Sequence, residues 1–153
     1  MNEVIDLIYG ARIEPDGDGY LVTFRDIENA FTCGDAIDEA IFNAQEVLDL
    51  MLLDRLEKDE EIPEPSAFKN GEIAIAASPE VAAPALLHIM RTLNHRSMAD
   101  VARTMGVTYQ SYQRMESGKN LTMKSFKKAA LALGSIVEIR LRKIQAIRPR
   151  PLR

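Results

Sequence analysis

Residues 97–119 read SMADVARTMGVTYQSYQRMESGK and predict two short helices joined by a tight turn. Ser97 and Thr108 can each begin a helix, because their hydroxyls can accept a hydrogen bond from a backbone N–H of the first turn. Gly106 allows the left-handed backbone that a sharp turn needs, and Ser117-Gly118 ends the second helix. The helices are expected over residues 98–105 and 109–116.

The apolar residues of this segment predict which side of each helix is buried. Six of them fall at spacings that fill the angle between the two helices: Val101, Ala102, Met105, Val107, Tyr112 and Met115. Tyr109, Gln110, Gln113 and Arg114 are left pointing outward from the second helix. In a major groove, Gln suits adenine, Arg suits guanine, and Tyr can pack on a thymine methyl group. We therefore expect the second helix to contact DNA bases.

Polar and basic residues around these helices complete the expected DNA-binding surface. Lysines beyond the second helix, including Lys127 and Lys128, could hold phosphates. The expected DNA-binding residues are Ser97, Thr108, Tyr109, Gln110, Gln113, Arg114, Ser117, Lys119, Asn120 and Lys124.

Residues 98–119 resemble the helix-turn-helix of the Xre/Cro and phage-repressor family. The resemblance is carried by the spacing of Ala102, Gly106 and Val107 and by the closing Glu-Ser-Gly-Lys, and it extends through a further helix to Gly134. Met98 stands where that family often has a Gln that braces the DNA backbone and the recognition helix. The resemblance implies binding to operator DNA.

Acidic and basic residues are divided between the two halves of the chain. Residues 1–78 hold nineteen Asp and Glu against five Lys and Arg, whereas residues 79–153 hold four against fourteen. The overall pI near 5.3 therefore hides a basic module that can meet phosphate. A plain helical bundle with a solvated basic face is the alternative, but charge of one sign destabilises so small a module unless a partner neutralises it. We expect the two halves to have different partners.

The acidic half predicts a small α+β domain. A turn rich in Asp and Gly separates two apolar, β-branched runs, which is typical of a hairpin. A helix beginning near Asp35 has apolar residues at spacings of three and four, so one face must pack on the sheet. The strands are expected around residues 6–14, 20–25, 30–32 and 72–77, in the order β-β-β-α-β.

Much of residues 5–77 resembles the N-terminal domain of HicB antitoxins, and one branch of that family carries a C-terminal helix-turn-helix domain. The resemblance implies a partial RNase H-like fold, not regarded as catalytic, that binds and masks a small basic RNA-cleaving toxin, HicA. It is carried by residues 13–24, 26–27, 31–35, 39–44 and 62–66.

The acidic side chains predict no catalysis, and they suit either a solvated face or a protein contact. Asp16 and Asp18 suit a tight turn, and no bidentate Glu follows at the spacing of a calcium loop. His88 and His95 are isolated, so we expect no metal, no cofactor and no catalytic residue. The dense acid on the helix is either a solvated face or a surface for a basic protein. The expected toxin contacts are the acids of two loops, Glu14, Asp16, Asp18, Asp26 and Glu28, which we expect to share one sheet edge.

Residues 135–142 alternate apolar and charged side chains, which predicts a half-buried strand. Val137, Ile139 and Leu141 form its apolar side. A lone strand has unpaired backbone groups unless a second chain supplies them. Antiparallel pairing about a two-fold axis near Ile139 would place Glu138 opposite Arg140 of the partner. We expect a homodimer through this strand, able to present two recognition helices to a palindromic operator.

The sequence thus predicts an α+β chain with two domains and a tail. Residues 1–78 are expected to form the partial RNase H-like domain, residues 79–142 the all-α helix-turn-helix domain with its terminal dimerisation strand, and residues 143–153 a flexible basic tail. The single cysteine, Cys33, suits a reducing cytoplasm, and no apolar run is long enough to span a membrane.

The expected function is that of an antitoxin that neutralises a HicA-type toxin and represses its own operon, as a homodimer or a higher oligomer, without enzymatic activity. The alternative is a stand-alone helix-turn-helix repressor whose N-terminal domain binds a ligand or another protein. A nuclease of the RNase H kind is disfavoured, because the sequence lacks a convergent set of acids with a partner His.

Overall fold

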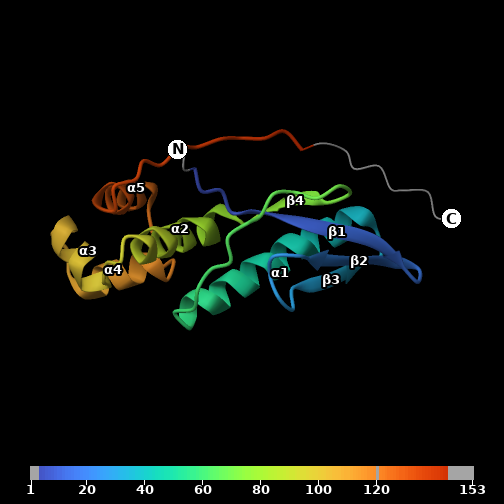
Figure 1. The fold of residues 1–153 in the computed structure, drawn as a ribbon, viewed down its shortest axis with the longest axis horizontal. Helices are drawn as coiled ribbons and strands as arrows, with labels where there is room; N and C mark the ends of the chain where they lie inside the picture. The colour runs from blue at the N-terminus through green and yellow to red at the C-terminus, as the bar shows by residue number, and fades with distance from the viewer. Residues whose placement is uncertain (1–3, 120, 145–153) are drawn as a thin grey trace. The chain divides into compact units, whose positions relative to one another are not determined.

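The computed structural model describes residues 4–119 and 121–144 (Figure 1). These residues form two compact units. Of the described residues, the first unit contains 4–51, Pro63–Ala77 and 140–144, and the second contains Leu52–Ile62, 78–119 and 121–139. The second unit therefore takes in a segment that precedes the expected boundary at residue 78. Most of the expected tail, residues 145–153, lies outside the described residues.

A four-stranded antiparallel sheet forms the centre of the first unit. Its strands are β1 (Ile8–Asp16), β2 (Gly19–Phe24), β3 (Phe31–Gly34) and β4 (Ile73–Ala76), arranged in the order β3-β2-β1-β4. β1 and β2 form the expected hairpin, in which Asp16 pairs with Gly19 and Ala11 with Phe24. The expected order β-β-β-α-β is confirmed, with strand bounds shifted by one or two residues.

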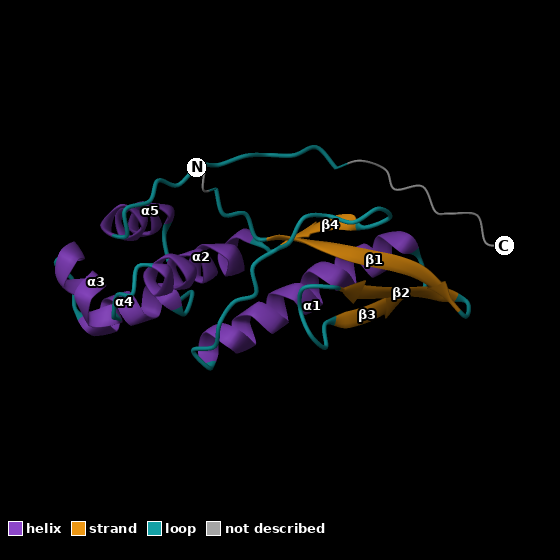
Figure 2. Ribbon diagram, in the orientation of Figure 1, coloured by secondary structure: helices purple, strands orange, loops and turns teal. Residues whose placement is uncertain are grey.

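Helix α1 (Ile37–Glu57) covers one face of this sheet (Figure 2). Its residues Ala40, Ala44 and Leu48 are completely buried, because apolar side chains at spacings of four share one helix face. Two side chains also fasten α1 to the sheet: the Asn43 amide donates to the Cys33 carbonyl at 2.9 Å, and the Gln45 amide donates to the Ala76 carbonyl at 3.0 Å.

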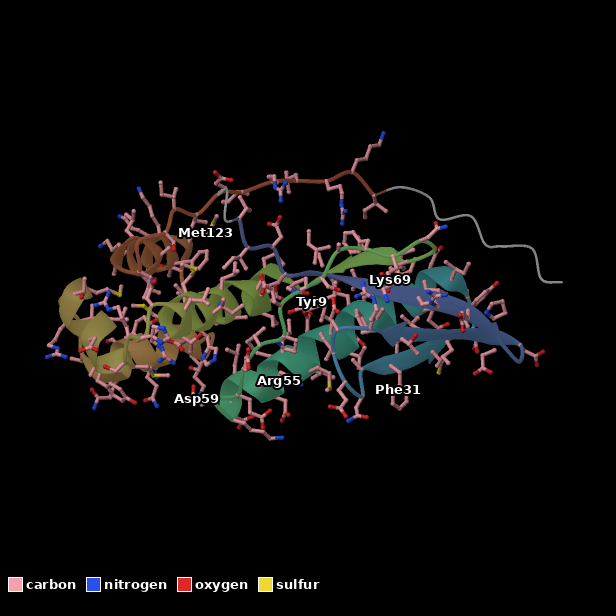
Figure 3. The ribbon with its side chains drawn as sticks, in the orientation of Figure 1. Tyr9, Phe31, Arg55, Asp59, Lys69 and Met123 are labelled. Carbon is pink, nitrogen blue, oxygen red and sulfur yellow. The ribbon has the colours of Figure 1, made fainter. Side chains whose placement is uncertain are left out.

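The two faces of the sheet differ in what covers them. On the side of α1, Tyr9, Val22 and Ile75 are buried. On the other side, which we call the open sheet face, Thr23 pairs with Arg12 and with Phe31, and all three of these residues are exposed. The Phe31 ring projects from the ribbon (Figure 3).

An arginine-centred network joins the turn after β2 to the segment that precedes β4. Arg25 donates from Nε to Glu72 Oε2 at 3.1 Å and from Nη2 to Glu72 Oε1 at 2.9 Å. Asp26 accepts the backbone N–H of Ser66 at 2.8 Å. The hydrogen bond from Arg25, assisted by the backbone N–H of Lys69, lowers the pKa of Glu72 to about 2.

Four helices make up most of the second unit: α2 (Pro79–Leu93), α3 (Met98–Met105), α4 (Tyr109–Glu116) and α5 (Met123–Ala132). The expected bounds of the two helices in residues 97–119 are confirmed. All six apolar residues expected between them are buried or half-buried. The buried core of this unit consists of Leu87, Val101, Ala102, Tyr112, Ala129 and Leu133.

Pro84 does not interrupt α2, although the sequence predicts a kink or a restart there. The helix is continuous from Pro79 to Leu93. Pro84 lacks only the N–H that would bond to the Glu80 carbonyl, so a single bond of the first turns is lost. The ring is completely buried, and this burial opposes the loss.

Residues 135–142 form no strand in the single chain, and the strand paired between two chains stays a prediction. A strand needs a neighbouring strand to satisfy its backbone N–H and C=O groups. Among the described residues, no strand lies beside residues 135–142. Ile139 and Leu141 are exposed by 67% and 99%, and Val137 is half-buried. Arg140, expected to face Glu138 of a partner, instead lies 2.5 Å from Asp6 of its own chain, in an exposed pair that contributes little stability.

Candidate nucleic-acid and protein interfaces

Two N-caps position the helix-turn-helix. The Ser97 hydroxyl accepts the backbone N–H of Asp100 at 3.1 Å, and the Asp100 carboxylate accepts the backbone N–H of Ser97 at 3.3 Å. The Thr108 hydroxyl accepts the backbone N–H of Ser111 at 3.1 Å. Gly106 takes the left-handed conformation, with φ of 69°, between the two helices. Ser97 and Thr108 therefore orient the helices, and each hydroxyl keeps a proton to donate to a phosphate.

The outward face of α4 brings together the four residues expected to contact bases. Tyr109 is exposed by 45%, and Gln110, Gln113 and Arg114 are also exposed. Tyr112 lies on the opposite side of the helix and is completely buried. The exposed side presents amide and guanidinium donors, amide acceptors and one aromatic ring, which are the groups that read base edges.

The Arg and Lys side chains of the second unit fall into two groups: those that bond to other groups of the protein, and those that are exposed and can bind phosphate. Arg91 and Arg96 bond to groups within the unit, and Arg103 pairs with Asp100. Within the described residues, Lys119 and Lys124 are exposed and form no ion pair. Arg114, Lys127 and Lys128 are likewise exposed and form no ion pair with the described residues. All five cations therefore remain available to bind phosphate. Ser117 donates its hydroxyl to the Arg114 carbonyl at 3.0 Å. Asn120 lies outside the described residues.

A buried charged cluster anchors the last residue of α4. Glu116 is 3% exposed and accepts three hydrogen bonds from Arg91 of α2, at 2.7 to 3.0 Å. His88 Nδ1 lies 3.0 Å from Glu116 Oε1, and Asp59 Oδ1 lies 3.7 Å from both His88 and Arg91. Burial would raise the pKa of Glu116, but the bonds from His88 and Arg91 outweigh burial and lower it. The cluster fixes α4 against α2.

Sequence reasoning missed this cluster. Glu116 follows Tyr112 by four residues and therefore shares the buried face of α4. It is also one of only four acids in residues 79–153. An acid at a core position in a basic module is a signal that a buried cation must be present, although the signal does not say which cation it is.

Arg96 holds two further helices in place. Its guanidinium donates to the Ala132 carbonyl at 2.8 Å and to the Asp100 carbonyl at 3.1 Å. The neighbouring Asn94 amide donates to the Leu133 carbonyl at 2.9 Å. The bonds to Ala132 and Leu133 satisfy carbonyls at the end of α5 that have no partner within the helix. The segment before α3 thus sets the positions of α3 and α5.

The five acids expected to contact a toxin fall into two separate groups. Glu14, Asp16 and Asp18 belong to the β1–β2 hairpin, whereas Asp26 and Glu28 follow the other end of β2. A strand of six residues separates the groups by about 20 Å, so the structure does not bring the two loops together. Asp26 is in addition occupied by Arg25 and by Ser66.

Among residues 4–119 and 121–144, no group of three His, Cys, Asp or Glu side chains could hold a metal ion. No helix in those residues has the length and apolar character needed to cross a membrane.

Comparison with known proteins assigns both halves of the chain. Residues 8–83 match the family described as HicB-like antitoxin of bacterial toxin–antitoxin systems, and residues 87–139 match a helix-turn-helix family. The chain is 33% identical over 132 residues to Antitoxin HicB 2 of Photorhabdus laumondii subsp. laumondii, covering 86% of this chain and 94% of that protein. This chain belongs to the HicB antitoxin family.

A second relative is a HP1 phage protein. The chain is 38% identical over 64 residues to the uncharacterized 14.9 kDa protein of the rep-hol intergenic region of Haemophilus phage HP1, covering 42% of this chain and 48% of that protein. Membership of the HicB family confirms the resemblance of the acidic half. The match of residues 87–139 to a helix-turn-helix family confirms the resemblance of the basic half. The chain therefore has an antitoxin domain and a DNA-binding regulatory domain.

Proposed function

We propose that this chain neutralises a HicA-type RNA-cleaving toxin with its acidic half and represses its own operon with its basic half. The observation that carries the proposal is the division of charge, nineteen acids against five bases before residue 79 and four against fourteen after it. An acidic surface speeds encounter with a cationic protein and repels nucleic acid, while a basic surface does the reverse. Each half is thus suited to a different partner.

The DNA-binding half is proposed to act through α4. Tyr109, Gln110, Gln113 and Arg114 would contact bases, and Ser97, Thr108, Ser117, Lys119, Asn120 and Lys124 would contact the backbone. The exposed side of α4 and the buried anchor at Glu116 support this assignment.

The assembly is proposed to be a homodimer that pairs residues 137–141 across a two-fold axis. The exposure of Ile139 and Leu141 supports it, because the described part of the chain leaves most of these apolar side chains exposed. A two-fold dimer would offer two copies of α4 to successive major grooves. We propose that the protein acts in the cytoplasm, without cofactor, metal or enzymatic activity.

The antitoxin proposal is tested in the operon. The gene neighbouring this one should encode a basic protein of roughly 60 to 80 residues, a size at which a small domain can fold alone. Expression of that protein alone should arrest growth, and co-expression of the full chain should restore it. A solitary gene, or growth arrest that co-expression does not relieve, would favour a stand-alone repressor.

One matched variant separates the two activities. Arg114→Ala should weaken repression of a promoter reporter, because Arg114 lies on the exposed side of α4, and should still relieve growth arrest. A variant that loses both activities together would contradict the assignment of toxin and DNA to different halves.

A further inference from the structure

The outward side of α1 carries large apolar side chains that the first unit leaves uncovered. Phe42 is exposed by 63% and Leu50 by 65%. These residues lie two helical turns apart and share one side of α1 with Glu46, opposite the buried Ala44. Exposed aromatic and aliphatic side chains on one helix face are typical of a contact surface.

Acidic residues surround these apolar side chains. Asp38, Glu39 and Glu46 are exposed on the same helix. Residues 37–51 contain four acids and no Lys or Arg, so this side of α1 has a negative potential that no neighbouring base on the helix offsets. We name the surface formed by Asp38, Glu39, Phe42, Glu46 and Leu50 the α1 ridge.

The open sheet face offers a comparison within the same unit. Phe31 is exposed by 63%, as Phe42 is, but its surroundings differ. Across the sheet lies Arg12, whose Nη1 is 3.9 Å from Glu14 Oε1. Charges of both signs occur there, so the open sheet face does not select a cationic partner as the α1 ridge does.

We propose that the α1 ridge is the docking surface for the basic toxin, with Phe42 and Leu50 as apolar anchors and the acids as their charged rim. The proposal rests on the proposed function and adds the surface that performs it. Buried aromatic anchors inside a polar rim contribute most of the energy in protein interfaces, and the rim charges accelerate association. A second ridge facing this one in a two-fold dimer would place acid against acid, and DNA would be repelled.

The proposal differs from the contacts expected from the sequence, which lie in two loops about 20 Å apart at the ends of β2. The α1 ridge spans Asp38 to Leu50, about 18 Å along one helix at 1.5 Å per residue. This is one continuous surface, whereas the two loops are not.

The test measures the dissociation constant between the full-length chain and the purified basic protein encoded by the neighbouring gene. The double variant Phe42→Ala/Leu50→Ala should weaken binding roughly tenfold or more. Phe31→Ala is the matched control, with the same exposure on the other side of the sheet, and should change binding by less than about twofold. Both variants replace exposed side chains, so circular dichroism and promoter binding should remain as in the parent chain.

A second variant tests the charged rim. Glu39→Gln/Glu46→Gln should slow association and reduce its dependence on salt, while the dissociation rate changes little. The same substitutions should leave the affinity for promoter DNA unchanged, which excludes a general loss of folded protein.

The outcomes separate this inference from the proposed function. If the parent chain does not bind the basic protein, the proposed function and the ridge both fail. If the parent chain binds and the Phe42→Ala/Leu50→Ala variant binds equally well, the ridge alone fails. The ridge also fails if Phe31→Ala is the damaging change, or if the double variant loses self-association in ultracentrifugation and keeps toxin affinity.

Discussion

Arg91 of α2 and Glu116 of α4 form a buried two-point ion pair, with Nε 2.9 Å from Oε2 and Nη2 2.7 Å from Oε1. The residues are 25 positions apart in the chain, and their exposed fractions are 8% and 3%. A bidentate pair fixes orientation as well as distance. It therefore sets the direction of the recognition helix relative to the helix behind it.

Removing the Glu116 charge should destabilise the second unit. In Glu116→Gln the buried Arg91 guanidinium loses its compensating charge, and we expect a loss of about 3 kcal/mol in the free energy of unfolding. Urea denaturation followed by circular dichroism measures it. Asp54→Asn is the control, because the Asp54–Lys58 pair at 2.8 Å is exposed and should contribute about 0.5 kcal/mol or less. Equal effects of the two variants would contradict the importance of the buried pair.

Acid should destabilise the fold through two carboxylates. The pKa of Glu72 is lowered to about 2 by Arg25, and the pKa of Glu116 is lowered because bonds from His88 and Arg91 outweigh the effect of burial. A lowered folded-state pKa contributes stability that is present above the ordinary value of 4.5 and is lost as pH falls through the folded value. Stability should therefore decline between about pH 5 and pH 2.

Urea titrations across this pH range test the assignment of the acid sensitivity. A glutamine at position 72 does not titrate, whereas Glu72 takes up a proton as the pH falls. The free energy of unfolding of Glu72→Gln should therefore depend less steeply on pH than that of the parent chain. An unchanged slope would show that Glu72 does not contribute to the acid transition.

DNA recognition should separate into base and phosphate contacts. Arg114→Ala should cost about 1 to 3 kcal/mol of discrimination at one base position. Lys124→Ala should weaken binding to all sequences alike and reduce the salt dependence by about one unit of slope. Fluorescence anisotropy with an operator and its single-base variants distinguishes these results. A uniform loss for Arg114→Ala would remove it from base readout.

Dimerisation should depend on the residues after Gly134. A chain ending at Gly134 lacks Val137, Ile139 and Leu141 and should sediment as a monomer, because the pairing strand is removed. A chain ending at Ile144 retains these residues and should remain a dimer. Analytical ultracentrifugation of both chains gives the comparison, and a dimer formed by the shorter chain would refute pairing through this segment.

Local sequence signals predicted the helix-turn-helix well. The caps at Ser97 and Thr108 act on the residues that directly follow them, and Gly106 needs only its own backbone conformation. The β1–β2 hairpin was predictable for the same reason, since turn chemistry is local. The helix restart predicted at Pro84 does not occur, because a proline early in a helix removes only one bond and the helix continues through it.

The candidate interfaces were only partly predictable. The outward side of α4 followed from helical periodicity, which also identifies which side of α1 is apolar and packed on the sheet. The exposure of Phe42 and Leu50 was not predictable, because an apolar residue in a sequence gives no indication of whether another element covers it. The separation of the acidic loops follows from the strand expected at residues 20–25, because a strand of that length keeps the loops at its two ends about 20 Å apart.

The sequence by itself determined the order of the elements, the two helices of residues 97–119 and the partition of charge, because each of these depends on neighbouring residues or on composition. Tertiary structure alone decided that Glu116 meets Arg91 and His88, that Arg25 meets Glu72, and that residues 135–142 pair with no strand among the described residues. Such contacts join positions tens of residues apart. Their energy comes from burying a charge beside its counter-charge, and no local pattern specifies the counter-charge.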